Sequence, residues 1–139
     1  MKFYIASNLK NHELVNYYAK KLEEKNWEQT YDWTKNITKE INFDVLKEMA
    51  KQEQQGIIDS DIVIILLPAG RGGHVELGMA MALNKMVFLC SPTTDDFKIE
   101  NTVVFYELET TNKLIGTPDE NIEKILTLSK RKGDKNELR

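Results

Sequence analysis

The stretch Asp61-Ile-Val-Ile-Ile-Leu-Leu67 decides the fold class of this chain. It is rich in β-branched residues and apolar at every position after the aspartate, so both faces of an extended strand would be apolar. A strand of this kind is typical of the centre of a parallel sheet that helices cover on both sides. Pro68 and the glycines after it end the strand, and the mostly apolar or small residues that follow predict a helix from about His74 to Asn84.

Strands and helices also alternate on either side of this stretch. Apolar periodicity predicts strands at residues 2–6, 27–33, 86–90 and 103–106, and helices at residues 11–22 and 42–59. The helix at 42–59 has one apolar stripe that contains Phe43, Leu46, Ala50 and Ile57. A capping box in Thr117-Pro-Asp-Glu120 begins a last helix that runs to about Leu128. The alternation predicts an α/β fold, a doubly wound, mostly parallel sheet of about five strands with helices on both faces, like flavodoxin or Rossmann folds.

Length and composition indicate one domain. The chain has 139 residues, 41% of them hydrophobic, which is enough for one core. We expect this domain to cover residues 1–128. Residues 129–139 are mostly charged, with a single apolar side chain, and predict a disordered tail.

Charge and cysteine content exclude several classes of function. The net charge of -3 offers no attraction to nucleic acid or to an anionic membrane surface, so we expect neither as a partner. The one cysteine, Cys90, excludes a disulfide framework and fits a cytoplasmic location. His12 and His74 are isolated in the sequence, so we predict no metal and no cofactor.

Glu76 is the strongest candidate for a catalytic residue. It follows a glycine-rich turn made by Gly70, Gly72 and Gly73, whose backbone can approach a ligand closely. In the predicted helix Glu76 lies in the first turn, where the helix dipole favours the ionised carboxylate. A fixed anion in a crevice is what an oxocarbenium-like sugar centre requires. The alternative is an ordinary dipole-stabilising glutamate beside a phosphate-binding turn, although the glycine spacing matches neither the dinucleotide nor the Walker fingerprint.

Glu53 is the second candidate. It lies within the apolar stripe of the helix at 42–59, where burying a carboxylate is unfavourable unless its pKa is perturbed or it is paired. A raised pKa would suit a general acid. The alternative is that Glu53 lies at the edge of the stripe and reaches solvent.

Three segments together resemble a known family. Ser60-Asp-Ile-Val-Ile, then the glycine-rich turn, then Val75-Glu-Leu-Gly-Met-Ala80 and Asn84-Lys-Met-Val-Phe88 resemble the central motif of nucleoside 2-deoxyribosyltransferases and of the related 2'-deoxynucleoside 5'-phosphate N-hydrolases. Phe3-Tyr-Ile-Ala-Ser7 is similar to the first strand of that family. The resemblance covers roughly residues 2–91.

The resemblance implies roles for three residues. Glu76 matches the nucleophile that displaces the nucleobase and holds the sugar covalently until water or a second base attacks. Tyr4 is similar in placement to a tyrosine that positions the nucleophile and the sugar, although it could also be only a buried strand aromatic. Glu53 stands where the family has an aspartate that helps to bind or protonate the leaving base, so this chain departs by one methylene.

The remaining candidates concern the substrate. Ser7 after the first strand, and Arg71 and His74 beside the glycines, could bind a 5'-phosphate, whereas scattered surface polarity is the ordinary explanation. Trp33 could stack on a base or belong to the core.

We therefore expect an enzyme that cleaves the N-glycosidic bond of a nucleoside or nucleotide, by 2-deoxyribosyl transfer or by hydrolysis. Two alternatives stay open: an NAD-cleaving glycohydrolase, and a nucleotide-binding or sensing protein without turnover. By analogy with the family, the resemblance also implies a homodimer or higher homo-oligomer.

Overall fold

The computed structural model describes the backbone of residues 1–137 and the side chains of residues 1–130. Five strands form one parallel sheet in the order β2-β1-β3-β4-β5, which confirms the predicted fold class. The strands are β1 Lys2–Ser7, β2 Glu28–Gln29, β3 Ile62–Leu66, β4 Met86–Ser91 and β5 Thr111–Ile115. The helices between and after them are α1 His12–Glu23, α2 Phe43–Asp59, α3 Gly70–Ala82 and α4 Pro118–Glu137.

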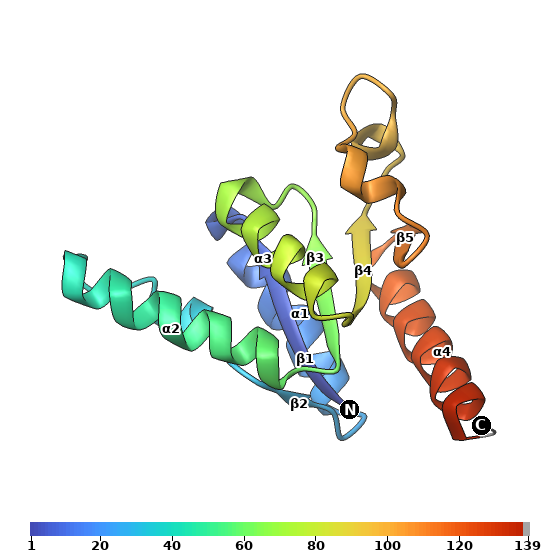
Figure 1. Cartoon of the computed structure of the whole chain (residues 1–139), viewed down its shortest axis with the longest axis horizontal. Helices are drawn as coiled ribbons and strands as arrows, with labels where there is room; N and C mark the ends of the chain where they lie inside the picture. Colours follow the sequence, from blue (N-terminus) through green and yellow to red (C-terminus); the bar gives the residue numbers. More distant parts are fainter. Residues whose placement is uncertain (138–139) are drawn as a thin grey trace.

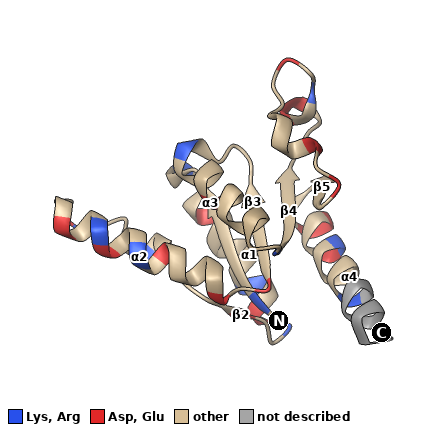
Figure 2. Ribbon diagram, in the orientation of Figure 1, with Lys and Arg blue, Asp and Glu red and all other residues tan. Residues whose placement is uncertain are grey.

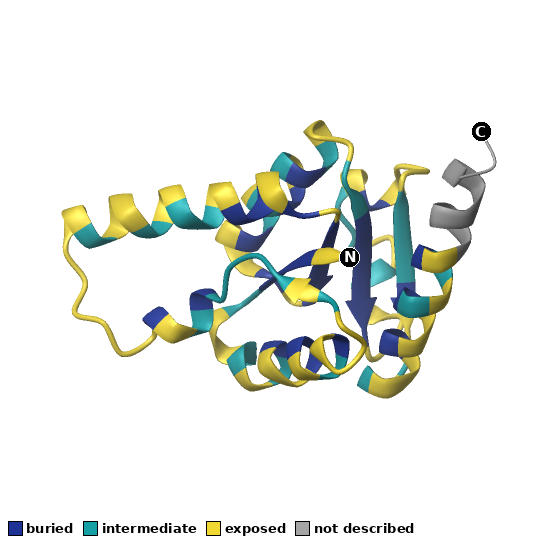
Figure 3. Ribbon diagram, turned by 90° about the horizontal axis from the view of Figure 1, so that it is seen from below, coloured by how far each residue is buried: buried dark blue, intermediate teal, exposed yellow. Residues whose placement is uncertain are grey.

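The helices cover both faces of the sheet. Helix α1 contacts α4 on one face, and α2 contacts α3 on the other (Figure 1). Every residue of β3 is buried, as are the central residues of β1 and β4, and together they form the core between the two layers. In Figure 3 these strands are dark blue while the outer faces of the helices are yellow. The apolar stretch at 61–67 is therefore the centre of the sheet, as predicted.

Helix α2 projects beyond the sheet. Only its end near Asp59 lies against the body of the molecule, and its first turns extend away from it (Figure 1). Phe43 is 84% exposed and Leu46 44%, whereas Gly56 and Ile57 are buried. The predicted apolar stripe is therefore wrong over its first half, because no neighbouring element of the described chain covers that half.

Two further expectations, about residues 103–106 and the start of α3, differ from the structure. Residues 103–106 are not a strand: Val104–Glu107 is a 3-10 helix, and the fifth strand is Thr111–Ile115. Helix α3 begins at Gly70 instead of His74, so the glycines form its first turns. Packing against the sheet outweighs the low helix propensity of glycine here.

Helix α4 also continues past the predicted end at Leu128. Its capping box is confirmed, since the Thr117 and Glu120 N–H groups donate to each other's side-chain oxygens at 3.2 Å. Ser129 is buried and donates to the Ile125 carbonyl at 2.6 Å, which continues the helix beyond the expected domain boundary. The backbone is helical to Glu137, and the rest of the expected tail, residues 138–139, lies outside the described residues.

Charged residues are distributed unevenly among the helices. Lys, Arg, Asp and Glu alternate along α2 and α4, while α3 carries little charge (Figure 2). Between Gly70 and Ala82 the charged residues are Arg71 and Glu76. Helix α3 therefore differs from the other helices in composition as well as in position.

Candidate active site

The site lies at the carboxyl ends of β1 and β3, where the strand order reverses. Ligands of open α/β sheets bind at such switch points. Ser7 ends β1, and its hydroxyl donates to the Leu66 carbonyl at the end of β3 at 2.7 Å. A cavity of about 330 Å³ opens beside these strand ends, and its lining includes Ser7, Asn8, Leu9, Trp33, Glu53, Ala69, Gly70, Arg71, Gly72, Gly73 and Glu76.

Tyr4 joins the two candidate carboxylates. Its ring is buried in the core on β1, and its hydroxyl donates a hydrogen bond to Glu76 on α3. Oε1 of Glu53, on α2, is 3.5 Å from the same hydroxyl oxygen. The fold thus brings Tyr4, Glu53 and Glu76 together from three different elements, and the two glutamates line the cavity.

Burial has the largest effect on the pKa values of Tyr4, Glu53 and Glu76. It raises the pKa of Glu76 to about 7, the hydrogen bond from Tyr4 opposes this rise, and the charge of Glu53 adds to it. Burial likewise raises the pKa of Glu53, with the Tyr4 hydrogen bond opposing it. Desolvation, followed by the two neighbouring carboxylates, raises the pKa of Tyr4 far above its ordinary value, so its hydroxyl stays a donor.

The expectation that Glu76 lies in the first helical turn, where the dipole favours its ionised form, is wrong. Because α3 begins at Gly70, Glu76 lies in the second turn and not in the first, and the dipole effect weakens beyond the first turn. Removal of the carboxylate from water has the larger effect, and it favours the neutral form. Two carboxyl groups that share one tyrosine can hold different protonation states, an arrangement suited to a nucleophile and a general acid.

All the predicted substrate-binding residues except His74 line the cavity together with the carboxylates. They are Ser7, Gly70, Arg71, Gly72 and Gly73. The Ser7 hydroxyl also accepts a hydrogen bond from the Asn11 side chain at 3.1 Å, so Asn11 does not use that side chain to cap α1.

His74 is not among the residues that line this cavity. Its Nδ1 lies 2.6 Å from the Gly70 carbonyl, and its Nε2 lies 2.6 Å from the Tyr106 hydroxyl. Since a carbonyl only accepts, Nδ1 donates to Gly70, and Nε2 pairs with the Tyr106 hydroxyl. His74 therefore faces the segment between β4 and β5.

Sequence reasoning missed part of the cavity wall. Asn8, Leu9 and Ala69 line it, and the only signal for them is that they follow the ends of β1 and β3. Trp33, for which two interpretations were open, is 7% exposed and lines the cavity as well. Its Nε1 donates to the Ile5 carbonyl at 2.7 Å, which fixes the indole beside the carboxylates.

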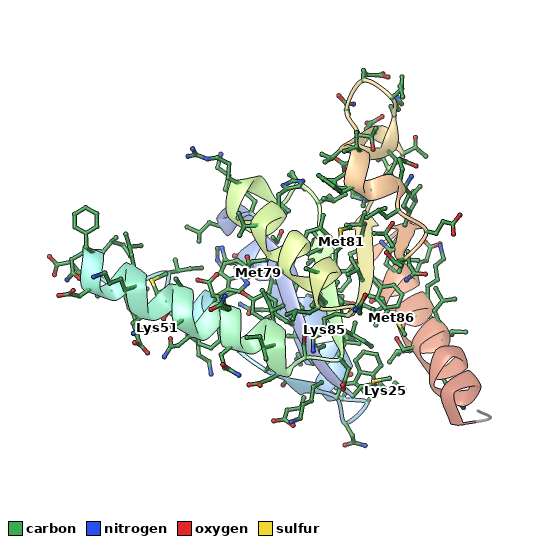
Figure 4. All side chains as sticks on the ribbon, viewed as in Figure 1. Lys25, Lys51, Met79, Met81, Lys85 and Met86 are labelled. Atoms are coloured by element: carbon green, nitrogen blue, oxygen red, sulfur yellow. The ribbon has the colours of Figure 1, made fainter. Side chains whose placement is uncertain are left out.

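A second hollow lies on the other side of α3. This apolar groove, of about 1000 Å³, is lined by α3 and the 103–108 segment: Gly70, Arg71, His74, Val75, Leu77, Gly78, Met81, Ala82, Val103, Phe105 and Leu108. Figure 4 shows Met79 on the side of α3 near α2 and Met81 on the side toward β4. Gly70 and Arg71 line both hollows, so the first turn of α3 separates the groove from the cavity.

Metal-binding clusters and membrane-spanning helices are both absent from the described residues. No group of three or more His, Cys, Asp or Glu side chains there is placed to hold a metal ion. None of the helices in that part of the chain is long and apolar enough to cross a membrane.

Comparison with known proteins identifies the family. The model of the nucleoside 2-deoxyribosyltransferase family matches residues 3–127. The chain belongs to this family. Membership supports an enzyme that cleaves or transfers N-glycosidic bonds of small-molecule nucleosides or nucleotides.

A solved structure of similar fold is consistent with membership of the nucleoside 2-deoxyribosyltransferase family. The CMP N-glycosidase BcmB from Clostridium botulinum matches with a TM-score of 0.59 and 17% sequence identity, over 90% of this chain and 98% of that one. At this identity the likeness concerns the fold. A search of the curated proteins finds no match.

Proposed function

We propose that this protein cleaves the N-glycosidic bond of a nucleoside or nucleotide with Glu76 as the nucleophile. The observation that carries the proposal is the placement of the buried Tyr4 hydroxyl between Glu76 and Glu53, two carboxylates that line a cavity. A tyrosine that only fills the core needs no carboxylate partner, and a glutamate that is only solvated needs no tyrosine partner. Buried carboxyl groups with raised pKa values that share a partner in a cleft are typical of catalytic sites.

In the first step, the ionised Glu76 carboxylate attacks the anomeric carbon of the sugar. A carbon–oxygen bond forms as the carbon–nitrogen bond to the base breaks. In the free site burial raises the pKa of Glu76 to about 7 and also raises that of Glu53, so Glu53 delivers a proton to the departing base once substrate binding places the proton of the pair on it. Tyr4 donates to Glu76 and holds the carboxylate in the direction of attack.

In the second step, an acceptor attacks the same carbon and releases Glu76. Water as the acceptor gives hydrolysis, and a second base gives transfer. Glu53, now ionised, accepts the proton of the incoming group, as microscopic reversibility requires. The same three side chains serve both outcomes, so the acceptor decides between hydrolase and transferase.

Arg71 makes a nucleotide the substrate class to test first. Its side chain lines the cavity at the beginning of α3, where the positive end of the helix dipole also favours an anion. A 5'-phosphate is the anionic group that a nucleotide would place there. The structurally similar protein is named for CMP, which is a nucleotide. The indole of Trp33 offers a flat apolar wall for the base.

We also propose that the protein works as a homodimer or larger homo-oligomer. The groove beside α3 is nearly all apolar, and Val75 and Phe105 in its lining are 59% and 57% exposed. Contiguous apolar surface of this kind marks an interaction site. Because Gly70 and Arg71 border both hollows, a second copy in the groove would lie next to the cavity.

Two further parts of the proposal concern the chain as a whole. One continuous core on both faces of the sheet supports a single domain over residues 1–128. The single cysteine, Cys90, is buried as a free thiol, which suits the reducing cytoplasm.

The test of the proposed activity is a chromatographic assay of base release. The protein is incubated with deoxynucleosides, nucleoside and deoxynucleoside monophosphates, and NAD, each with and without an acceptor base. Release from monophosphates identifies a nucleotide hydrolase, and exchange of bases identifies a transferase. Release of nicotinamide alone would replace the proposal with an NAD glycohydrolase. Tight binding of a nucleotide without any product would indicate a sensing protein instead.

A further inference from the structure

We propose that Gly56 on α2 is a positioning residue for Tyr4, because its missing side chain sets where the tyrosine hydroxyl lies between the two carboxylates. The inference rests on the proposed function and extends it to a residue outside the cavity wall. Gly56 does not touch the cavity, so it would act only through Tyr4.

The first argument is the space around Gly56. A Cβ atom placed there would lie 3.0 and 3.2 Å from Cδ2 and Cε2 of Tyr4, and 2.8 Å from Cβ of Tyr31. Contacts this short force a neighbour to move. Glycine in the interior of a helix destabilises it relative to alanine. Close packing against the Tyr4 ring gives this glycine a reason to be in α2.

The second argument is that α2 cannot move away to make room. The Thr30 hydroxyl donates to the Gly56 carbonyl at 2.7 Å, and the Tyr31 hydroxyl donates to Oε1 of Gln52 at 2.8 Å. The buried Asn36 side chain in turn donates to the Tyr31 hydroxyl. These bonds hold residues 30–36 against the turn of α2 that precedes Gly56. A new methyl group would therefore press on Cβ of Tyr31, which these bonds hold in place, and the remaining displacement would fall on the Tyr4 ring.

The third argument is that the site tolerates little displacement of Tyr4. Its ring is fully buried, its hydroxyl donates to Glu76, and Glu53 is at the limit of hydrogen-bonding distance at 3.5 Å. Because Glu53 lies one turn before Gly56 on α2, the same packing also sets the distance between Tyr4 and Glu53. A ring shift of a few tenths of an ångström would weaken the bond to Glu76.

The test is a double-mutant cycle between Gly56→Ala and Tyr4→Phe. Gly56→Ala should lower kcat by about 10²-fold, as expected for a misplaced catalytic group, with KM changed less than about 3-fold. Tyr4→Phe should have a similar effect. The double variant should lose no more than about 3-fold beyond Tyr4→Phe alone, since both changes remove the same interaction. Gln54→Ala, an exposed position on the same helix, is the matched control and should leave kcat unchanged.

A pH profile separates positioning from general loosening. The Tyr4 hydrogen bond lowers the pKa of Glu76. Gly56→Ala and Tyr4→Phe should therefore both move the acid limb of kcat to higher pH. Retained kcat in Gly56→Ala, an unshifted acid limb, or additive losses in the cycle would overturn the inference.

Two measurements keep the test independent of the proposed activity and of the folding of one variant. Titration of the Glu76 carboxyl by carbon-13 NMR, without substrate, should give a higher pKa in Gly56→Ala than in the wild type. An equal pKa overturns the inference even if no substrate is turned over, whereas a higher pKa without turnover contradicts only the proposed function. If Gly56→Ala does not fold, the double variant Gly56→Ala, Tyr31→Gly, which removes the closest clash at Cβ of Tyr31 and keeps those at the Tyr4 ring, should raise the same pKa, and an unchanged value overturns the inference.

Discussion

The two sides of helix α3 differ in size and in chemistry. The side near α2 borders a cavity of about 330 Å³ where Glu76 meets Tyr4 and Glu53. The side near the 103–108 segment borders a groove of about 1000 Å³ whose wall is almost entirely apolar. Among the described residues that line this larger hollow there is no charged pair, and the His74 ring contacts the Gly70 carbonyl and the Tyr106 hydroxyl.

The comparison shows that the volume of a hollow does not by itself indicate where a reaction takes place. Burial of the carboxylates in the small cavity raises their pKa values, and such destabilised groups are what a catalytic site uses. The groove offers apolar area and shape, which suit a protein surface better than a small polar substrate. A substitution on the cavity side should therefore change turnover, and one on the groove side should change assembly.

The largest effect is expected from Glu76→Gln on the cavity side. The amide keeps the shape and can still accept from Tyr4, but it cannot attack the sugar. Turnover should fall by about 10³-fold or more, the scale of a lost nucleophile. Steady-state assays of base release measure the effect, with the exposed Glu48→Gln on α2 as the control. Turnover within a few-fold of the wild type would remove Glu76 from the mechanism.

The same substitution should change how stability depends on pH. The pKa of Glu76 rises from 4.5 to about 7 on folding, so the native state binds more protons than the unfolded state between these values. The stabilising effect is complete below pH 4.5 and is lost as pH rises through 7. At about 1.36 kcal/mol per pKa unit, the wild type should lose on the order of 3 kcal/mol relative to Glu76→Gln.

Urea unfolding of both proteins at pH 5 and pH 8.5 measures this difference. Titrating groups that do not interact with Glu76 cancel in the comparison, and repeating it in a Glu53→Gln background removes the carboxyl that does. A stability difference that does not change between the two pH values would show that Glu76 has an ordinary pKa in the folded protein.

A charge introduced into the groove should weaken assembly. Phe105→Asp replaces an exposed aromatic in the groove wall, and loss of such a contact should weaken association by about 2 kcal/mol, or roughly 30-fold in Kd. Sedimentation velocity across a dilution series measures the shift. Ile99→Asp, at a 91% exposed position of the β4–β5 connection outside the groove, should leave assembly unchanged. A wild type that is monomeric at all concentrations would refute the oligomer proposal.

The smallest effect is expected from Gly78→Ala. Unlike Gly56, this glycine has nothing within 4 Å of the place that a Cβ atom would take, so alanine should stabilise α3 in the dilute chain by about 0.5–1 kcal/mol. If a second copy packs closely on the groove, the same methyl group should weaken assembly. Thermal melts at low and high protein concentration distinguish the two contributions.

The central elements could be predicted from the sequence because burial alone determines them. Consecutive apolar residues at 62–66 and 86–90 can only be satisfied inside the sheet. The edge strand β5 could not be predicted in this way, since Thr111, Asn112 and Lys113 are partly exposed and look like a loop. Conversely, the apolar residues at 103–106 indicate a strand, but Val103 and Phe105 line the groove instead.

The site residues could be predicted only where their residue type is unusual for its surroundings in the sequence. Glu76 and Glu53 stand out as carboxylates among apolar neighbours, and the family resemblance adds Tyr4. The start of α3 was misjudged because glycines indicate a turn, and this error placed Glu76 one turn too early. Nothing in the sequence distinguishes Gly56, whose contacts to Tyr4 and Tyr31 exist only after residues 4, 31 and 56 are brought together.

The nearly uncharged helix α3 also has a consequence for colloidal behaviour. With a reactive cavity on one side and an apolar groove on the other, α3 has few positions left for solubilising charge, and Arg71 and Glu76 both lie in its first half. If the proposed oligomer forms through the groove, dilution below its Kd exposes this surface to water and to vessel walls. Dilute samples should then lose a larger share of the protein by adsorption than concentrated ones.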